Sequence, residues 1–285
     1  MIIIKEKDNR LFLQHGPIDI VIEAIGKDKS IAYEKVKTYF KNLLSELVLE
    51  LELLKKEVKY NRQFTNHIAQ RMQQATQEFH PDFITPMAAV AGSVADSVLE
   101  VLTSGFILEK AYVNNGGDVS FYLNKGQSMK SSLASMPNTF TEIKYEDKSR
   151  GVATSGWRGR SFSLGIADSV TVLANNAGMA DAAATMIANS VNLKDHPLIK
   201  KSYAQDLNYS SDLFGQMVTT EVGKLSEKDI IKAINNGHTK AKTYLGNNLI
   251  NSALIQLCDY FCIVQRTSPT LNIINKSNLK KICFE

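Results

Sequence analysis

Residues 85–105 read TPMAAVAGSVADSVLEVLTSG, and residues 110–123 read KAYVNNGGDVSFYL. The first stretch predicts a helix, because Pro at the first helical position loses no hydrogen bond and the Thr85 hydroxyl can cap free amides. Its Ala, Gly, Ser and Val residues are small enough for the helix to lie close against a sheet or a ligand. The second stretch predicts two strands joined by a glycine-containing turn.

The same combination occurs a second time along the chain. Residues 151–155 and 163–174 have the pattern of strands, and residues 179–191 predict another helix of small residues. This repetition predicts the α+β class, with a duplicated strand/helix unit that shares one core. No linker rich in Pro, Gly and Ser interrupts the chain. We therefore expect a single domain over residues 1–285.

The remaining elements follow from periodicity and capping signals. Apolar residues three and four apart predict helices over residues 30–59 and 66–78, and the capping box Ser226–Asp229 begins a further helix. Strands are expected at residues 2–4, 11–13 and 18–24, a hairpin at 250–264, and a loop or insertion over 192–216.

The composition excludes several classes of protein. The chain has 285 residues with 44% hydrophobic and 22% charged residues, and its net charge of +4 comes from scattered Lys and Arg. We therefore expect no nucleic-acid partner. Three cysteines without a C-x-x-C spacing predict free thiols rather than disulfides or a metal site. We find no signal-type apolar segment and no 18-residue apolar run, so we expect a cytoplasmic protein without membrane contact.

The turn Asn114-Asn115-Gly116-Gly117-Asp118 is the sharpest local feature. Adjacent glycines allow positive φ and let a flat ring or a phosphate approach the backbone closely, while the flanking Asn and Asp side chains can read ring edges. The alternative is an ordinary type I′ hairpin turn, for which Asn-Gly pairs are common.

Two further segments carry candidate ligands. Asp181 and Thr185 are four residues apart on the second small-residue helix, so their oxygens share one face and suit Mg²⁺. The alternative is that Asp181 only complements the helix dipole and Thr185 bonds the backbone. Thr154 and Ser155 end the strand at 151–155, where their hydroxyls can bind a pyrophosphate or a ring, or only close a capped turn.

In order and spacing these segments resemble the ApbE-like superfamily, whose enzymes transfer FMN from FAD to a threonine of a target protein using Mg²⁺. The likeness runs from about His15 to Gly237. The matching segments are similar to the family motifs A-K-G-x-x-x-D, G-G-D, A-T-S-G, S-V-T-V and A-D-x-x-A-T. They lie here at residues 92–96 (the Gly-to-Asp spacing of the first motif), 116–118, 153–156, 169–172 and 180–185.

The resemblance implies an ApbE-like fold, a flavin nucleotide (FAD or FMN) and Mg²⁺. The metal would be held by Asp181, Thr185 and a backbone carbonyl near Val90. The flavin would be lined by Asn115, Gly116, Gly117, Asp118, Thr154 and Ser155. It also implies an acceptor protein as partner, and the sequence is compatible with an oligomer.

Two departures from the family concern its chemistry. In place of the family's H-[IV]-[IV]-D-P segment and the loop after it, this chain has a shorter segment, residues 159–168, which contains no histidine. The position of the lysine in the A-K-G motif is occupied by Ala91. Asp168, the only carboxylate in the replaced segment, is the candidate catalytic base; its alternative role is an exposed hairpin acid. The expected function is flavin-nucleotide binding, as a Mg²⁺-dependent FMN transferase or FAD pyrophosphatase, or as a non-catalytic carrier or redox-assembly subunit. The enzyme assignment stays open.

Overall fold

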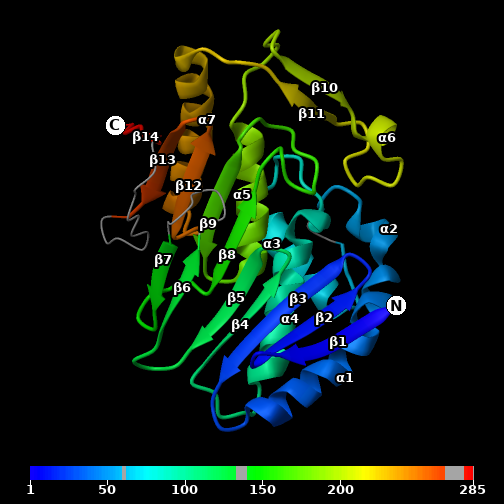
Figure 1. Ribbon diagram of the computed structural model, residues 1–285. Helices are drawn as coiled ribbons and strands as arrows, with labels where there is room; N and C mark the ends of the chain where they lie inside the picture. The colour runs from blue at the N-terminus through cyan, green and yellow to red at the C-terminus, as the bar shows by residue number, and fades with distance from the viewer. Residues whose placement is uncertain (60–61, 133–139, 267–278, 285) are drawn as a thin grey trace. The chain divides into compact units, whose positions relative to one another are not determined.

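The computed structural model describes residues 1–59, 62–132, 140–266 and 279–284 (Figure 1). The chain forms two compact units, each described below by itself. The first unit comprises Met1–Met129, Ile143–Ala153 and Ala174–Asp181, and the second comprises Lys130–Glu142, Thr154–Leu173 and Ala182–Glu285. The assignment of residues 1–285 to one domain stays a prediction.

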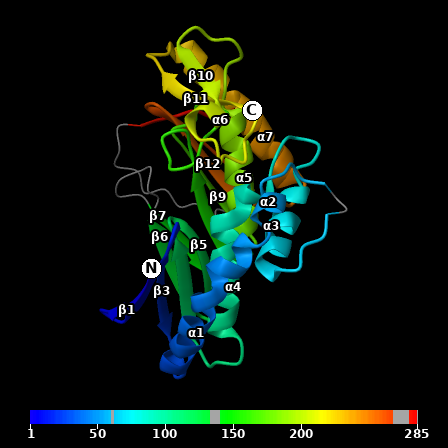
Figure 2. The same cartoon turned by 90° about the vertical axis from the view of Figure 1, so that its right-hand side faces the viewer.

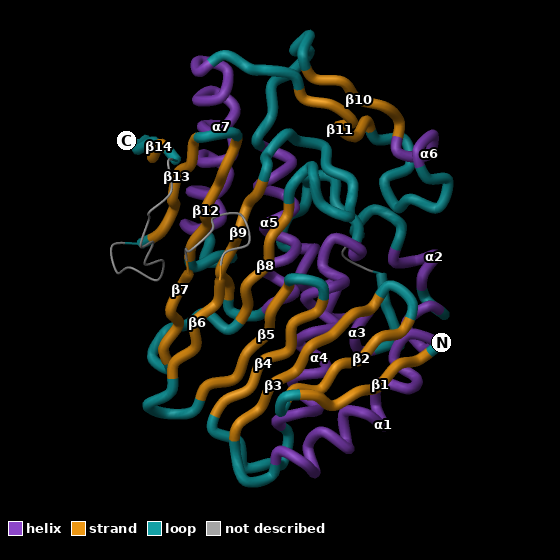
Figure 3. The backbone as a smooth tube through the Cα atoms, viewed as in Figure 1, coloured by secondary structure: helices purple, strands orange, loops and turns teal. Residues whose placement is uncertain are grey.

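An antiparallel sheet forms one layer of the first unit (Figure 3). Its strands lie in the order β1-β2-β3-β4-β5-β8. They are β1 (Ile2–Lys7), β2 (Arg10–His15), β3 (Ile18–Ile25), β4 (Lys110–Asn115), β5 (Asp118–Leu123) and the first residues of β8 (Gly151–Ser155). The register places Asn115 beside Ile20 on one side and Asp118 on the other, so the glycine turn lies at an end of the sheet.

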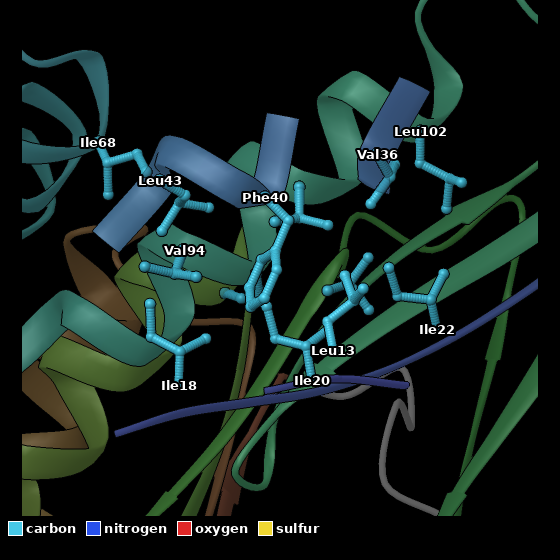
Figure 4. Packing of buried hydrophobic residues seen from close by; sticks show 14 of the residues in the cluster. Leu13, Ile18, Ile20, Ile22, Val36, Phe40, Leu43, Ile68, Val94 and Leu102 are labelled. Carbon is cyan, nitrogen blue, oxygen red and sulfur yellow. The ribbon is translucent and has the colours of Figure 1, made fainter. Parts of the chain in front are cut away.

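Helices cover one face of this sheet, where α1, α3 and α4 lie together (Figure 2). The helical elements are α1 (Lys29–Val48), α2 (Leu51–Leu54), α3 (His67–Gln77), the 3-10 turn η1 (Pro86–Ala89) and α4 (Val90–Thr103). Alternate strand residues point inward, so Leu13 and Ile20 face Phe40 of α1 in the core (Figure 4). All three side chains are at most 1% exposed.

The second unit has its own strands and a covering helix. Its strand order is β9-β12-β13-β14, and α7 packs against β12 and β13. The strands are β9 (Ser169–Ala174), β12 (Ser252–Leu257), β13 (Tyr260–Gln265) and β14 (Lys280–Lys281), and the helix is α7 (Glu227–Gly246). A two-stranded ribbon of β10 (Ile199–Tyr203) and β11 (Met217–Val222) adjoins α6 (Ala204–Leu207).

Two elements cross the boundaries of the units. The helix α5 (Ala177–Ser190) begins in the first and continues in the second, and β6 (Ser128–Ser132) pairs with β7 (Phe140–Lys144). Helices and antiparallel strands occur in both units, so the predicted α+β class is confirmed.

Several predicted boundaries are wrong. The helix expected over residues 30–59 ends at Val48 and is followed by the short α2. Thr85 makes no capping hydrogen bond through its side chain, and Pro86 opens a 3-10 turn rather than the α-helix itself. The loop expected over 192–216 contains β10 and α6. Ser226 does cap α7, with its hydroxyl accepting the Asp229 N–H at 3.2 Å.

By length and composition, Pro86–Thr103 is apolar enough to cross a membrane, so the expectation of no 18-residue apolar run is wrong. Half of this stretch is buried within the structure, and helices in protein cores have the same composition.

Candidate functional site

The first unit brings together the starts of two helices, each of which carries an Ala-Gly pair followed about one turn later by an aspartate. Ala91-Gly92 is followed by Asp96 in α4, and Ala177-Gly178 is followed by Asp181 in α5. The Asp96 carboxylate accepts the N–H groups of Ala177 and Gly178 at 3.0 and 2.8 Å. It thereby satisfies amides that have no partner within α5. The protein itself therefore supplies hydrogen-bond partners for this half-buried carboxylate.

The Asp181 carboxylate makes the reciprocal contact with the start of α4. Its Oδ2 accepts the Gly92 N–H at 3.1 Å. This exchange requires very close packing, since a Cβ on Gly92 would lie 2.2 Å from the Ala177 carbonyl oxygen. Glycine is therefore needed at position 92 for steric reasons. The partially positive start of α4 also favours a negative charge at Asp181.

Asp118 and Asp181 form a pair of carboxyl groups that are hydrogen-bonded to each other. Asp118 begins β5 and is 9% exposed, and Asp181 is half-buried. Burial raises the pKa of Asp181 well above its ordinary value, and the charge of Asp118 raises it further, while the Gly92 N–H opposes both effects. Two adjacent carboxylates repel unless they share a proton or a cation lies beside them. The pair is therefore suited to a positively charged ligand.

The glycine turn lies next to this pair. Asn115 at the end of β4 is buried; its Nδ2 donates to the Ala91 carbonyl at 3.1 Å, and its Oδ1 accepts the Asp19 N–H at 3.4 Å. Gly116 and Gly117 have φ of 64° and 118°, and both are exposed. No atom lies within 4 Å of a Cβ built on Gly117, so a flat group can approach this backbone. The turn is also a tight hairpin, as the alternative interpretation requires.

The proposed metal ligands lie on α4 and α5. Val90 is the first residue of α4, and Thr185 follows Asp181 by one helical turn on α5. Among the residues that the structure describes, no three His, Cys, Asp or Glu side chains come together as a metal site. The oxygens available to a hard cation in the first unit are therefore those of Asp118 and Asp181 and neighbouring carbonyls.

Thr154, Ser155 and Asp168 belong to the second unit, as Thr185 does. Thr154 is exposed at the end of β8, with its hydroxyl 2.8 Å from that of Thr171, and Ser155 is half-buried. Asp168 accepts hydrogen bonds from the Trp157 indole at 3.3 Å, the Arg158 Nε at 3.1 Å and the Cys258 N–H at 2.6 Å. That Thr154, Ser155 and the glycine turn line one flavin stays a prediction.

Two roles were missed in the sequence. Asp118 was predicted only to contact the flavin, but it also pairs with Asp181 across 63 residues of chain. Asp96 holds the start of α5. The repeated Ala-Gly pair with an aspartate in the following turn was visible at residues 91–96 and 177–181, and it was the available signal.

Comparison with known proteins places the chain in a family. A family model described as "AbpE bacteria" matches residues 2–264. A UPF0280 protein of Methanobrevibacter smithii is 30% identical over 207 residues, which are 67% of this chain and 85% of that protein. A UPF0280 protein of Methanosphaera stadtmanae is 32% identical over 163 residues, 54% of this chain and 66% of that protein. With other such relatives the match covers about half of their length.

Two solved structures are also similar. The flavinyl transferase ApbE of Pseudomonas stutzeri aligns with a TM-score of 0.42 and 11% identity, over 93% of this chain and 95% of that chain. The flavin transferase ApbE of Vibrio cholerae aligns with a TM-score of 0.47 and 13% identity, over 94% and 97%. Both scores are below 0.5, so membership is carried by the family model and the archaeal relatives. The chain belongs to the AbpE bacteria family, and its predicted resemblance to the ApbE-like superfamily is confirmed.

Proposed function

We propose that this protein binds a flavin nucleotide, FAD or FMN, together with Mg²⁺. The family and the five motifs support the flavin, and the Asp118–Asp181 pair carries the metal part of the proposal. Mg²⁺ prefers carboxylate oxygens, keeps several waters and bridges to substrate phosphates. A carboxyl group whose pKa is raised by burial and by an adjacent carboxylate, as that of Asp181 is, fits such an ion, since the ion can take the place of a proton.

The enzymatic form of the proposal is a Mg²⁺-dependent FMN transferase or FAD pyrophosphatase. Asp181 and Thr185, with a carbonyl near Val90, would hold the ion, and Asp118 would add a second carboxylate. When bound, the ion would neutralise charge on the pyrophosphate. An acceptor protein as partner and a cytoplasmic location belong to the same proposal.

Flavin binding is tested by isothermal titration of FAD and FMN with and without Mg²⁺. The Gly117→Val variant is expected to lose at least about tenfold in affinity, because its side chain occupies the open face of the turn. Gly126→Val is the matched control, since Gly126 also has positive φ, at 79°, and open surroundings. Its backbone strain should be similar and its flavin affinity unchanged. The absence of any heat or fluorescence quenching with either nucleotide would contradict flavin binding.

A second candidate function, a non-catalytic flavin carrier, is favoured by the surroundings of Asp168. Both of its carboxylate oxygens accept hydrogen bonds from the protein. A base that must take a proton from an acceptor hydroxyl works best with a free oxygen. The family's histidine segment is also missing from residues 159–168.

Transfer of FMN to a threonine-containing acceptor peptide is therefore expected to be weak or absent. General acid–base catalysis contributes roughly a hundred- to ten-thousand-fold in rate, so binding can persist while transfer nearly stops. The assay incubates protein, FAD, Mg²⁺ and peptide, and detects flavin fluorescence on a denaturing gel. A strong covalent band that disappears in Asp168→Ala would contradict the carrier and identify Asp168 as the base. Release of AMP without a band would indicate pyrophosphate hydrolysis instead.

A further inference from the structure

The loop after β8 holds an arginine in a fixed orientation. The Arg158 Nε donates to Asp168 Oδ1 at 3.1 Å, and its guanidinium lies over the Trp157 ring, 4.7 Å from the ring centre. The Trp157 indole donates to the same carboxylate oxygen at 3.3 Å. The two side chains and the carboxylate therefore constrain one another, and each contact favours the same position of the guanidinium.

Asp168 is in turn fixed by the backbone around it. Its Oδ2 accepts the Cys258 N–H at 2.6 Å, and its own N–H donates to the Gln256 carbonyl at 3.1 Å. A Cβ on Gly156 would lie 2.3 Å from the Asp168 carbonyl oxygen, so the loop after β8 packs directly on this segment. The arginine is consequently held by groups that belong to the framework of the second unit.

Most of the Arg158 guanidinium remains available for a ligand. Its side chain is 68% exposed. Within the part of the chain that the structure describes, only Nε makes a hydrogen bond, and the two terminal nitrogens have no protein acceptor. An ordinary surface ion pair is mobile and contributes little. Here the stacking and the ion pair reduce the ordering that binding would otherwise require.

We propose that Arg158 is a binding residue for a phosphate oxyanion, with Asp168 and Trp157 as its positioning residues. A planar guanidinium with two parallel N–H groups matches two oxygens of a phosphate, which a lysine cannot do. The strand end that carries Thr154 and Ser155 lies immediately before this loop. Only the source of the phosphate rests on the proposed function. That source would be a flavin nucleotide rather than free pyrophosphate or phosphate.

Trp157 makes the test specific, because it is the single tryptophan of the chain. Inorganic pyrophosphate is titrated at constant ionic strength while Trp157 fluorescence is recorded. We expect a saturable change in the wild type. In Arg158→Lys, which keeps the charge but loses the planar fork, the dissociation constant should rise at least about tenfold. In Arg158→Ala saturation should be lost.

Arg10→Ala is the matched control, because Arg10 also pairs through Nε with a carboxylate, Glu23 at 2.9 Å, but does so in the first unit. It should bind pyrophosphate like the wild type. The proposal is overturned if the wild type shows no saturable change, or if Arg158→Lys and Arg158→Ala keep the wild-type dissociation constant.

A second titration identifies the source of the phosphate, with riboflavin, FMN and FAD followed by calorimetry. A nucleotide source predicts that Arg158→Lys weakens FMN and FAD but leaves riboflavin unchanged. If pyrophosphate binds through Arg158 while no flavin binds at all, the oxyanion site stands and the proposed function fails. If flavins bind equally well to wild type and Arg158→Ala and pyrophosphate does not bind, only the oxyanion site fails.

Discussion

The Gly92→Ala variant is expected to melt roughly 6–12 °C below the wild type, which corresponds to about 3 kcal/mol for a chain of this length. The added Cβ would lie 2.2 Å from the oxygen, 2.4 Å from the carbon of the Ala177 carbonyl and 2.7 Å from the Gly178 nitrogen. These are backbone atoms, so no side-chain rotation can relieve the contact. The starts of α4 and α5 must separate, and the hydrogen bonds that Asp96 and Asp181 exchange between them weaken.

Gly246→Ala is the control for this variant. Gly246 ends α7, and no atom lies within 4 Å of a Cβ built there. Alanine favours a helix over glycine by up to about 1 kcal/mol, so the control should melt at or slightly above the wild-type temperature. Thermal unfolding followed by circular dichroism measures both variants. Equal melting temperatures for the two would contradict the close packing of the helix starts.

Local periodicity predicted the first unit better than the second. The strands β1 to β3 and most of α1 follow from apolar residues at two- and four-residue spacing. The end of α1 could not be predicted in this way, because the apolar pattern continues through Leu54 and Val58, which are also buried. Just after the end of α1, the Glu50 carboxylate accepts the Thr65 N–H and hydroxyl at 2.7 Å each, a tertiary contact that local periodicity does not encode.

In the second unit the pattern failed for a different reason. Residues 163–168 were predicted as strand, but the Ile166 N–H donates to Val191 and the Asp168 N–H to Gln256, so no single neighbouring strand forms a ladder. β10 was missed because its sequence, Ile199–Tyr203, has no buried face. A strand without a buried face has no apolar–polar alternation to detect.

The residue types of the candidate site were predictable, but their pairing was not. Asp118 and Asp181 were both identified from local motifs, as a ring contact and as a metal ligand. Their contact depends on how β5 and α5 pack, which neither motif encodes. The raised pKa of Asp181 follows from that contact and from burial, so it too is a property of the folded chain.

The Asp181→Asn variant is expected to lose the Mg²⁺ dependence of FAD binding while folding normally. Asparagine keeps an oxygen that can accept the Gly92 N–H, and its amide can donate to Asp118, but it carries no charge for a cation. Calorimetric titration of FAD with and without Mg²⁺ measures the ratio of the two affinities. We expect at least about a tenfold ratio in the wild type and a ratio of about one in the variant.

The same variant is expected to be more stable than the wild type when Mg²⁺ is chelated. A carboxyl group whose pKa is raised by folding contributes stability below its ordinary pKa, and this contribution is lost as the pH rises through the folded pKa. As the pH is raised from about 5 to about 8, the melting temperature of the wild type should therefore fall more than that of Asp181→Asn. Added Mg²⁺ should raise the melting temperature of the wild type but not that of Asp181→Asn. The increase should be smaller at the lower pH, because protons compete with the ion for the ligand oxygens.

Asp8→Asn is the matched control, since it removes the same charge from a side chain that is 82% exposed. Its melting curve and Mg²⁺ dependence should follow the wild type. If Asp181→Asn binds FAD and Mg²⁺ like the wild type, then Asp181 acts only as the cap of α4, and the metal part of the proposal is wrong. If the variant loses Mg²⁺ dependence but Asp118→Asn retains it, Asp181 is a ligand without its partner. Loss in both variants is the expected result, because a cation held by the pair needs both charges.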